Sequence, residues 1–206
     1  MDIERLLSEI EPSQSDRILH QLGFDLVREY FLIAEHLPMS EGPVLELATG
    51  TGRMSAVLAS LHPSVITGDI SLTDMPRAFA RIPAQYRNRV QFQLLDMVKL
   101  PFRNDSVKSL VCMNTLHETE HPESCLEEMI RIVDPSGVFI VGDFSRKGFD
   151  TMQTIQRTVY HNDHSEGSIS TEAIKKILQQ HFDSILTFTT NLNITYIASL
   201  KRHHSV

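Results

Sequence analysis

The sequence predicts an α/β domain in which helices cover both faces of a mostly parallel β-sheet. From residue 43 onward, short apolar runs alternate with helical patterns, which is typical of repeated βα units around a parallel sheet. The run at 107–113 is almost wholly apolar, as expected for a strand that is buried on both faces. The last two alternating runs, 185–189 and 194–200, are separated by a short polar link and predict an antiparallel hairpin.

The order of the elements follows from the apolar pattern and from the positions of proline and glycine. The expected strands before the hairpin are 44–47, 65–68, 90–95, 107–113 and 138–142, and the expected helices are 54–61, one from about residue 73, one from 122 that stops at 134–137, and 171–180. Residues 2–37 are interpreted as one or two helices broken near Pro12 and Gly23. We therefore expect an N-terminal helical cap, 1–40, and one compact domain, 41–206.

The composition is that of an ordinary folded protein and disfavours several classes. Hydrophobic residues make up 41% and charged residues 22% of the 206 residues, so neither disorder nor a fibrous class is expected. The formal charge of −7 argues against nucleic acid as a partner. No signal peptide and no apolar run suited to membrane insertion is recognised, so we expect a cytoplasmic protein. Cys112 and Cys125 form no CxxC motif and are expected to be buried thiols.

A tight turn follows the first expected strand. In the segment 44–52, VLELATGTG, Glu46 stands near the end of the strand, and Gly50 and Gly52 follow it. Glycine adopts dihedrals closed to other residues, and the next helix presents free N–H groups, so a parallel sheet binds nucleotides at such a turn. The alternative is a tight turn without a ligand. The dinucleotide motif GxGxxG is incomplete because Ser55 occupies its third glycine position, and Glu46 would repel a pyrophosphate but attract a cation.

This turn resembles the first motif of the class I S-adenosylmethionine (SAM)-dependent methyltransferases, especially the small-molecule branch that includes the ubiquinone and menaquinone biosynthesis methyltransferases. The resemblance covers about residues 43–145, and Ala48 replaces the first glycine of the family's GxGxG. It implies a Rossmann-like class I methyltransferase fold with a mostly parallel seven-stranded sheet, and SAM as the cofactor, with S-adenosylhomocysteine as its product. The loop residues that it places at the cofactor are Glu46, Ala48, Thr49, Gly50 and Gly52.

Further segments follow the family's motifs in the same order. Asp69 ends the second strand 23 residues after Glu46, close to the spacing at which an acid meets ribose hydroxyls. With its neighbour Ile70, it is implied to bind the ribose, although alone it could equally cap the next helix. Asp96 is implied to accept a hydrogen bond from the adenine amino group and Met97 to pack on the ring, whereas by itself Asp96 would be interpreted as a solvated loop acid.

Residues after the fourth and fifth strands should meet the methyl acceptor. The resemblance places Asn114 at the cofactor, at the end of the fourth strand. His117 is the best candidate for a general base, because an unperturbed pKa near 6.5 suits proton removal at neutral pH; alternatively, it packs under the cap or caps a loop. Asp143, at the end of the fifth strand, could orient an acceptor. Residues in a polar segment that could close over the site are Tyr160, His161 and His164.

A metal site and a nucleic-acid substrate are both disfavoured. His117, His121 and Cys125 stand at i, i+4 spacing, but Pro122 places His121 before the helix rather than on it, so no metal is expected. Enzymes that methylate base amino groups carry Asn or Asp followed by Pro-Pro-aromatic after the fourth strand, and the cytosine C5 enzymes attack with a cysteine after proline. Neither pattern occurs in this sequence.

We therefore expect a SAM-dependent methyltransferase acting on oxygen, nitrogen or carbon of a small-molecule acceptor, with no nucleic acid partner and no membrane insertion. A homodimer is compatible with the sequence but is not specified by it. Two rival functions stay open. One is a SAM-binding protein with degenerate catalysis and a regulatory or assembly role, motivated by Ala48 and by the lack of an assured base. The other is a nicotinamide oxidoreductase.

Overall fold

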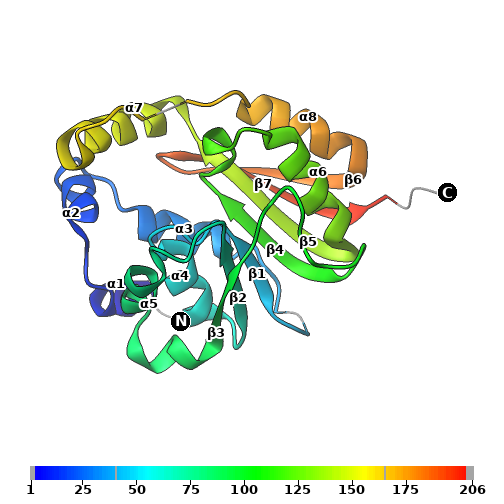
Figure 1. The fold of residues 1–206 in the computed structure, drawn as a ribbon, viewed down its shortest axis with the longest axis horizontal. Coiled ribbons are helices and arrows are strands. Elements are labelled where there is room, and N and C mark those ends of the chain that lie inside the picture. Colours follow the sequence, from blue (N-terminus) through cyan, green and yellow to red (C-terminus); the bar gives the residue numbers. More distant parts are fainter. Residues whose placement is uncertain (1–2, 40, 165, 203–206) are drawn as a thin grey trace.

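The computed structural model describes residues 3–39, 41–164 and 166–202. A seven-stranded sheet with the order β3-β2-β1-β4-β5-β7-β6 forms its centre, and helices pack on both faces of that sheet (Figure 1). The first five strands are parallel, and β7 and β6 pair antiparallel at one edge. The predicted fold class, including the C-terminal antiparallel hairpin, is confirmed.

The bounds of the elements are close to those that the apolar pattern predicts. The strands are β1 Val44–Leu47, β2 Val65–Asp69, β3 Val90–Leu94, β4 Val107–Met113, β5 Val133–Phe144, β6 Phe182–Thr189 and β7 Asn193–Lys201. The helices are α1 Ile3–Glu9, α2 Gln14–Gln21, α3 Leu26–Ala34, α4 Arg53–Leu61, α5 Met75–Arg81, α6 Pro122–Ile132, α7 Arg146–Ile155 and α8 Thr171–His181. The short helical segments are η1 Ala84–Arg89, η2 Leu116–Glu118 and η3 Gln156–Tyr160.

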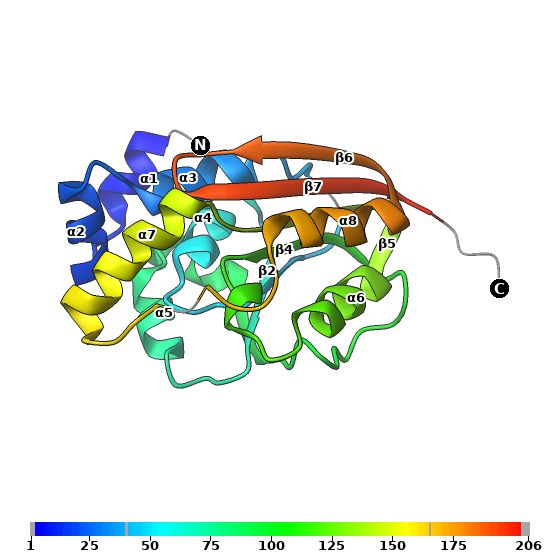
Figure 2. The ribbon, with the colours of Figure 1, turned by 90° about the horizontal axis from the view of Figure 1, so that it is seen from above.

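The period-2 alternation of the strands divides the apolar side chains between two cores. On β4, Val111 and Met113 belong to the core under α1 to α4, whereas Leu110 and Cys112 belong to the core under α6 and α8. Figure 2 shows α6 and α8 beside one another, away from α1 to α3. Cys112 and Cys125 are buried free thiols, as predicted. Both faces of the sheet are therefore packed, which explains why β4 is almost continuously apolar.

The N-terminal segment contains three helices rather than the predicted one or two. The breaks fall near Pro12 and Gly23, as expected, because each following helix has its own N-cap. The side chain of Ser13 accepts a hydrogen bond from the backbone of Asp16 to begin α2, and that of Asp25 caps α3. Gly23 has a φ of +83°, a conformation that ends α2 at low cost.

The fifth strand begins at Val133, so the prediction that it begins at residue 138 was wrong. Asp134 to Gly137 form an irregularity within the strand, and the register against β4 shifts between Val107 and Ser109. The Asp134 carboxylate accepts hydrogen bonds from the backbone N–H and the hydroxyl of Ser136, at 2.8 and 2.6 Å. Turn-forming residues therefore make a bulge, because β4 continues to supply pairing partners on both sides of it.

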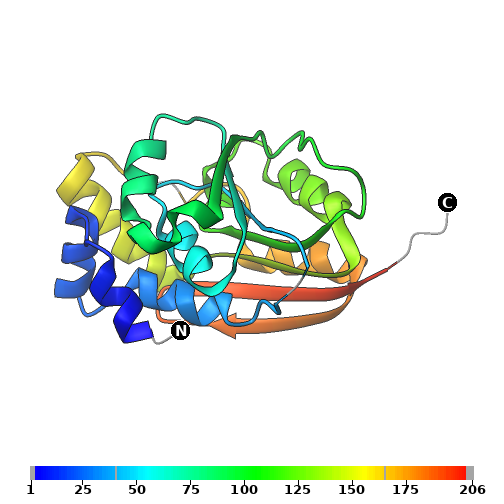
Figure 3. The ribbon, with the colours of Figure 1, turned by 90° about the horizontal axis from the view of Figure 1, so that it is seen from below.

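Helix α7 lies in the segment that the sequence presented only as polar. Its N-cap is Ser145, whose hydroxyl accepts a hydrogen bond from the backbone N–H of Gly148 at 3.1 Å. Only a narrow apolar stripe, including Phe149, Met152 and Ile155, faces the protein, which makes the helical pattern weak. Figure 3 shows α7 (yellow) at the same end of the molecule as the N-terminal helices (blue).

The strand order reverses direction at β1. This strand pairs with β2 on one side and with β4 on the other, so the loops after β1 and β4 separate at the carboxyl ends of the strands. A doubly wound sheet binds its ligands in the crevice that such a reversal creates. Within the described ranges, none of the helices has the length and apolar character needed to cross a membrane.

Candidate functional site

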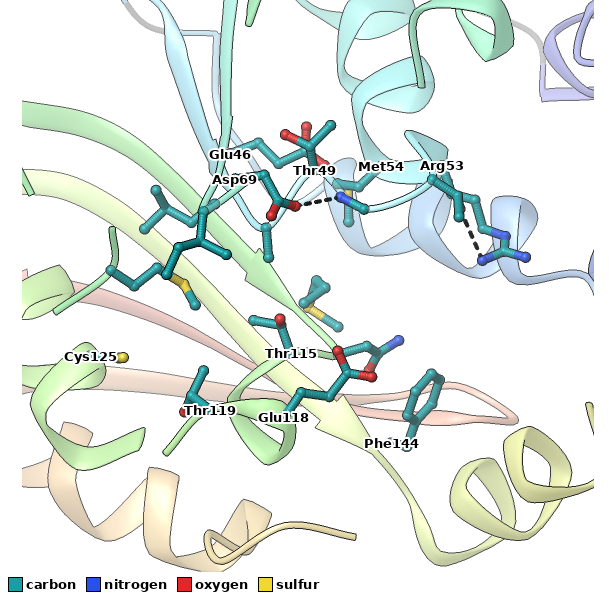
Figure 4. Close-up of a pocket in the computed structure, with 18 of the residues that line it drawn as sticks. Glu46, Thr49, Arg53, Met54, Asp69, Thr115, Glu118, Thr119, Cys125 and Phe144 are labelled. Carbon is teal, nitrogen blue, oxygen red and sulfur yellow. Dashed lines mark hydrogen bonds between the residues drawn. The ribbon is translucent and has the colours of Figure 1, made fainter. Parts of the chain in front are cut away.

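A cavity of about 960 Å³ opens at this reversal point. Figure 4 shows its lining side chains in two groups: Glu46, Thr49 and Asp69 come from β1, β2 and the loop after β1, and Thr115, Glu118 and Phe144 face them across the opening. Of the residues that the sequence placed at the cofactor, those that line the cavity are Glu46, Ala48, Thr49, Gly50, Asp69, Ile70, Asp96, Met97 and Asn114. A volume of this size is at the upper end of the range for small-molecule sites.

The loop after β1 is held in a left-handed conformation. Ala48, Gly50 and Gly52 have φ angles of 64°, 48° and 78°. The Asp69 carboxylate accepts a hydrogen bond from the backbone N–H of Gly50 at 2.9 Å, which ties the loop to the end of β2 (Figure 4). Gly52 is absent from the cavity wall: a side chain there would meet the Cα of Ala78 at 2.7 Å. Its smallness therefore lets α4 pack closely on α5.

Glu46 lies at the base of the cavity and is 2% exposed. Burial raises the pKa of its carboxyl to about 7, although the Ser55 hydroxyl donates to it at 2.5 Å. Next to it, the hydroxyls of Thr49 and Thr67 form a buried hydrogen bond of 2.6 Å. A cation that binds beside this buried carboxyl would favour its charged form.

The two other predicted acids lie nearer the surface. Asp69 does not cap the next helix, because the N-cap of α5 is Asp74, five residues further on; the capping alternative was wrong. Asp96 is exposed, and its carboxylate accepts a hydrogen bond from the backbone N–H of Val98 at 2.9 Å. Met97 and Ile70 lie along the same rim, and Ile70 is 73% exposed.

Asn114 connects the cavity to the N-terminal helices. It has a φ of 54°, and its amide donates to the Tyr30 hydroxyl at 2.9 Å and to the side-chain oxygen of Asn193 at 2.7 Å. Asn193 in turn donates to the buried carboxylate of Glu29 on α3 at 2.6 Å. This chain of hydrogen bonds joins α3 to the ends of β4 and β7, and sequence reasoning did not reveal it.

A second link joins α2 to the start of α4. Asp16 is buried and accepts from Arg53 and from Arg81, each at 2.7 Å. Burial favours the neutral acid, but the two guanidinium groups outweigh that effect and hold the pKa of Asp16 below its usual range. Arg53 also donates to the Ser15 hydroxyl at 2.8 Å, and both of these residues line the cavity.

Apolar side chains form another part of the cavity wall. They come from α3, α4, α7 and the ends of β4 and β5: Leu26, Tyr30, Met54, Met113, Phe144, Met152 and Ile155. This composition suits an acceptor with an apolar body.

The predicted catalytic residues His117 and Asp143 form a buried pair. The imidazole Nδ1 lies 2.6 Å from the Asp143 carboxylate, which also accepts from the backbone N–H of His117 at 3.2 Å. The residues are 2% exposed, and neither belongs to the cavity wall. The rings of Phe149 and His164 pack against His117, with centroids 5.1 and 5.0 Å away. Their catalytic role stays a prediction, whereas packing of His117 beneath α7 and the loop that follows it is observed.

The remaining candidates divide between the wall and the surface. His164 lines the cavity, and so does Glu118, which sequence reasoning missed although it adjoins His117. His161 is exposed, and the side chain of Tyr160 lies outside the described part of the structure. His121 precedes α6 as its N-cap residue, with a φ of −129°, so it does not share a helix face with Cys125.

Comparisons with known proteins agree with this geometry. A family model described as "Methyltransferase domain" matches residues 45–141, which run from β1 into β5 and include the loops after β1, β2, β3 and β4. These residues, somewhat less than half of the chain, therefore resemble a methyltransferase domain. The family implies SAM as the cofactor.

Two curated relatives are named for quinone biosynthesis. The demethylmenaquinone methyltransferase of Clavibacter sepedonicus is 30% identical over 120 residues, which are 55% of this chain and 48% of the relative. The ubiquinone/menaquinone biosynthesis C-methyltransferase UbiE of Desulfotalea psychrophila is 30% identical over 118 residues, 56% of this chain and 47% of the relative. The chain therefore spans about half the length of the curated relatives that it matches. The methyltransferase domain thus resembles the quinone branch that the loop motif suggested.

Among solved structures, the trans-methyltransferase CalH, in complex with S-adenosylhomocysteine, has a TM-score of 0.58 against this chain. The identity is 18%, and the alignment covers 84% of this chain and 55% of CalH. At this identity the likeness shows the fold alone.

Proposed function

We propose that this chain transfers the methyl group of SAM to a small-molecule acceptor. The observation that carries the proposal is the mixed lining of the cavity: the carboxylates of Glu46, Asp69 and Asp96 lie around the loop after β1, and apolar side chains of α3, α4 and α7 form another part of the wall. The acidic side suits a cofactor with sulfonium and ammonium charges and two sugar hydroxyls. The apolar side leaves room for an acceptor near the methyl group.

The cofactor roles assigned to the acids follow their positions. Asp69 uses one carboxylate oxygen to hold Gly50, and its other oxygen is only weakly engaged, by Ser71 N–H at 3.4 Å, so it can accept from the ribose. Asp96 takes the adenine amino group, and Met97 packs on the ring. Glu46 lies beside the loop that would receive the methionine part, where a positive charge would favour its ionised form.

The acceptor is proposed to be a flat or apolar metabolite. The apolar wall supports this, and the curated relatives act, by name, in ubiquinone and menaquinone biosynthesis. Transfer would be an in-line displacement in which the S–CH₃ bond breaks as the acceptor bonds to carbon, the electron pair returns to sulfur, and a proton leaves the acceptor. His117, oriented by Asp143, is a candidate for taking that proton only if the acceptor reaches behind Glu118 and His164.

Residues 1–40 are proposed to act as a cap on a domain formed by 41–206. Ser15, Leu26 and Tyr30 of the N-terminal helices line the cavity, which supports this arrangement. We further propose a cytoplasmic enzyme without a nucleic-acid partner; the net charge of −7 favours this. A homodimer remains a proposal that the size of the particle in solution would test.

The test is a calorimetric titration of the full chain with SAM, S-adenosylhomocysteine and NAD, followed by transfer of radiolabelled methyl to quinone precursors and catechols. Binding of the first two ligands, with label appearing in one acceptor class, supports the proposal. Binding without turnover on any acceptor would favour a degenerate SAM-binding protein. Binding of NAD alone would overturn the cofactor assignment.

A further inference from the structure

Two histidines and a glutamate come together beside the cavity, at the ends of segments far apart in the sequence. One nitrogen each of His117 and His164 and a carboxylate oxygen of Glu118 all lie within 4.8 Å of one another. His117 Nε2 and Glu118 Oε1 are 3.7 Å apart. We propose that these three side chains bind a divalent transition-metal ion at the wall of the cavity, away from the loop after β1 that is assigned to SAM.

Both imidazoles present a buried nitrogen that needs a partner. Among the described residues, His117 Nε2 and His164 Nε2 are buried without a hydrogen-bond partner, and the side chain of His117 is fully buried. A buried polar atom left unpaired costs about 1 to 3 kcal/mol, so such atoms usually mark a missing water or ion. A metal ion between the two nitrogens would satisfy both at once.

Asp143 prepares His117 for this role. It lies 2.6 Å from Nδ1, so the proton of the neutral imidazole is placed on Nδ1 and the lone pair on Nε2. Metal-binding histidines commonly donate their other nitrogen to a carboxylate, which fixes the ring and raises its basicity. The surrounding rings of Phe144 and Phe149 complete a largely apolar shell.

The segment that carries His164 is fixed against His117 rather than loosely placed. A side chain at Gly167 would lie 2.1 Å from the backbone oxygen of His117, so glycine permits this close approach. On the other side, Gln153 of α7 accepts from the backbone N–H of His164 at 2.7 Å and donates to Asp163 at 2.6 Å. The nearness of the two imidazoles is therefore built into the fold.

The ligand set selects the class of ion. Imidazole nitrogens and one carboxylate suit zinc, iron or cobalt better than magnesium or calcium, which prefer oxygen ligands. With metal–ligand bonds of about 2.0 to 2.2 Å, ligand atoms on one ion lie roughly 3 to 4 Å apart. The three ligand atoms, which lie up to 4.8 Å apart, would need a small movement to share one ion.

The open side of the ion would face the cavity. Glu118 and His164 belong to its wall, and three protein ligands leave at least one position of a metal ion free. This step of the inference rests on the proposed methyl transfer. The free position would hold an oxygen atom of the acceptor, and that oxygen would lose its proton more easily when bound to the metal. His117 would then be a metal ligand and not a general base.

The test is metal binding by the full chain after treatment with a chelator. Co²⁺ is followed by its visible absorption and Zn²⁺ by calorimetry, in the background His203→Ala/His204→Ala, which removes the terminal histidine pair of the sequence as a competing site. A single saturable site is expected, with a Co²⁺ spectrum typical of nitrogen and oxygen ligands. His164→Ala and Glu118→Gln should each lower the affinity about tenfold or more, and Asp143→Asn by about 10- to 100-fold.

The matched control is His161→Ala, because His161 is exposed and lies in the same segment outside the cluster. Its affinity should equal that of the parent chain. The inference would be overturned if His164→Ala left the metal affinity unchanged. It would also be overturned if the parent chain bound no more metal than His164→Ala does, and the two imidazoles would then be a packed pair. SAM titrations of the same samples separate the two proposals, because a parent chain that binds SAM but no metal ion contradicts only this one.

Discussion

Asp69 accepts a hydrogen bond of 2.9 Å from the backbone N–H of Gly50, so the acid at the end of β2 holds the loop that follows β1. The two elements are neighbours because β1 and β2 pair in register up to Leu47 and Gly68. One carboxylate is therefore proposed to have two tasks: it fixes the loop, and its second oxygen would accept from the ribose. Removing it should affect the shape of the site and its contacts together.

Asp69→Ala should weaken SAM binding by about 1 to 3 kcal/mol, because ribose hydroxyls and the Gly50 N–H both lose an acceptor. Calorimetric titration with SAM and with S-adenosylhomocysteine measures the loss, which should be similar for both. Asp74→Ala is the control, since Asp74 belongs to the turn before α5 and is not part of this cavity. Equal SAM affinities of wild type and Asp69→Ala would refute the ribose assignment.

Ala48→Gly should stabilise the protein. Ala48 has a φ of 64°, in the left-handed region that costs a residue with a Cβ about 1 to 2 kcal/mol, whereas glycine costs roughly 0.5 to 1 kcal/mol in chain entropy. The expected net gain in the free energy of unfolding is about 0.5 to 1 kcal/mol, measured by urea denaturation. Ala56→Gly, within α4, should have the opposite sign. A loss of stability on Ala48→Gly would show that this methyl group contributes packing that outweighs the backbone strain.

The raised pKa of Glu46 predicts that the stability of the protein depends on pH. Because burial raises its pKa in the folded protein to about 7, the folded state binds the proton more tightly than the unfolded state does between about pH 4.5 and 7. The contribution of Glu46 to stability is therefore fully present below pH 4.5 and is lost as the pH rises through 7, on the order of 2 to 3 kcal/mol. The unfolding free energy of the wild type, measured relative to that of Glu46→Gln, should therefore fall as the pH rises from 4.5 to 8.

The same carboxyl should couple SAM binding to proton release. A cation beside Glu46 favours its ionised form, so binding near pH 6.5 should release a fraction of a proton. Calorimetry in two buffers of different ionisation enthalpy measures it. Glu46→Gln should abolish the difference between the buffers, and an unchanged difference would show that another group releases the proton.

Much of the site could be predicted because its residues stand next to strand ends. Glu46, Asp69 and Asp96 follow apolar runs, and the carboxyl ends of parallel strands meet at one edge of the sheet. The local pattern therefore places these three acids together without any knowledge of long-range contacts. The same reasoning located β4 and the C-terminal hairpin.

Contacts between distant segments could not be predicted in this way. Asp16 of α2 meets Arg53 of α4 and Arg81 of α5 only in the folded chain, and no spacing in the sequence encodes that meeting. Likewise, His164 approaches His117 because α7 turns the chain back, and the narrow apolar stripe of α7 concealed the helix. The strand at Val133 was missed because turn residues within it form a bulge rather than an end.

Asp16→Asn should destabilise the protein strongly. The variant leaves Arg53 and Arg81 without their buried anion, and breaking a buried ion pair typically costs about 3 to 5 kcal/mol. Since the folded-state pKa of Asp16 is depressed, its contribution is present above pH 4 and is lost as the pH falls through the depressed folded-state value. Urea denaturation at pH 7 and pH 3 should therefore show a smaller difference in unfolding free energy between wild type and variant at the lower pH.

The control is Asp183→Asn, which breaks the exposed pair with Arg202 and should cost less than about 1 kcal/mol. If the two variants cost the same, the buried ion pair does not hold α2 in place, and the proposed cap has another anchor.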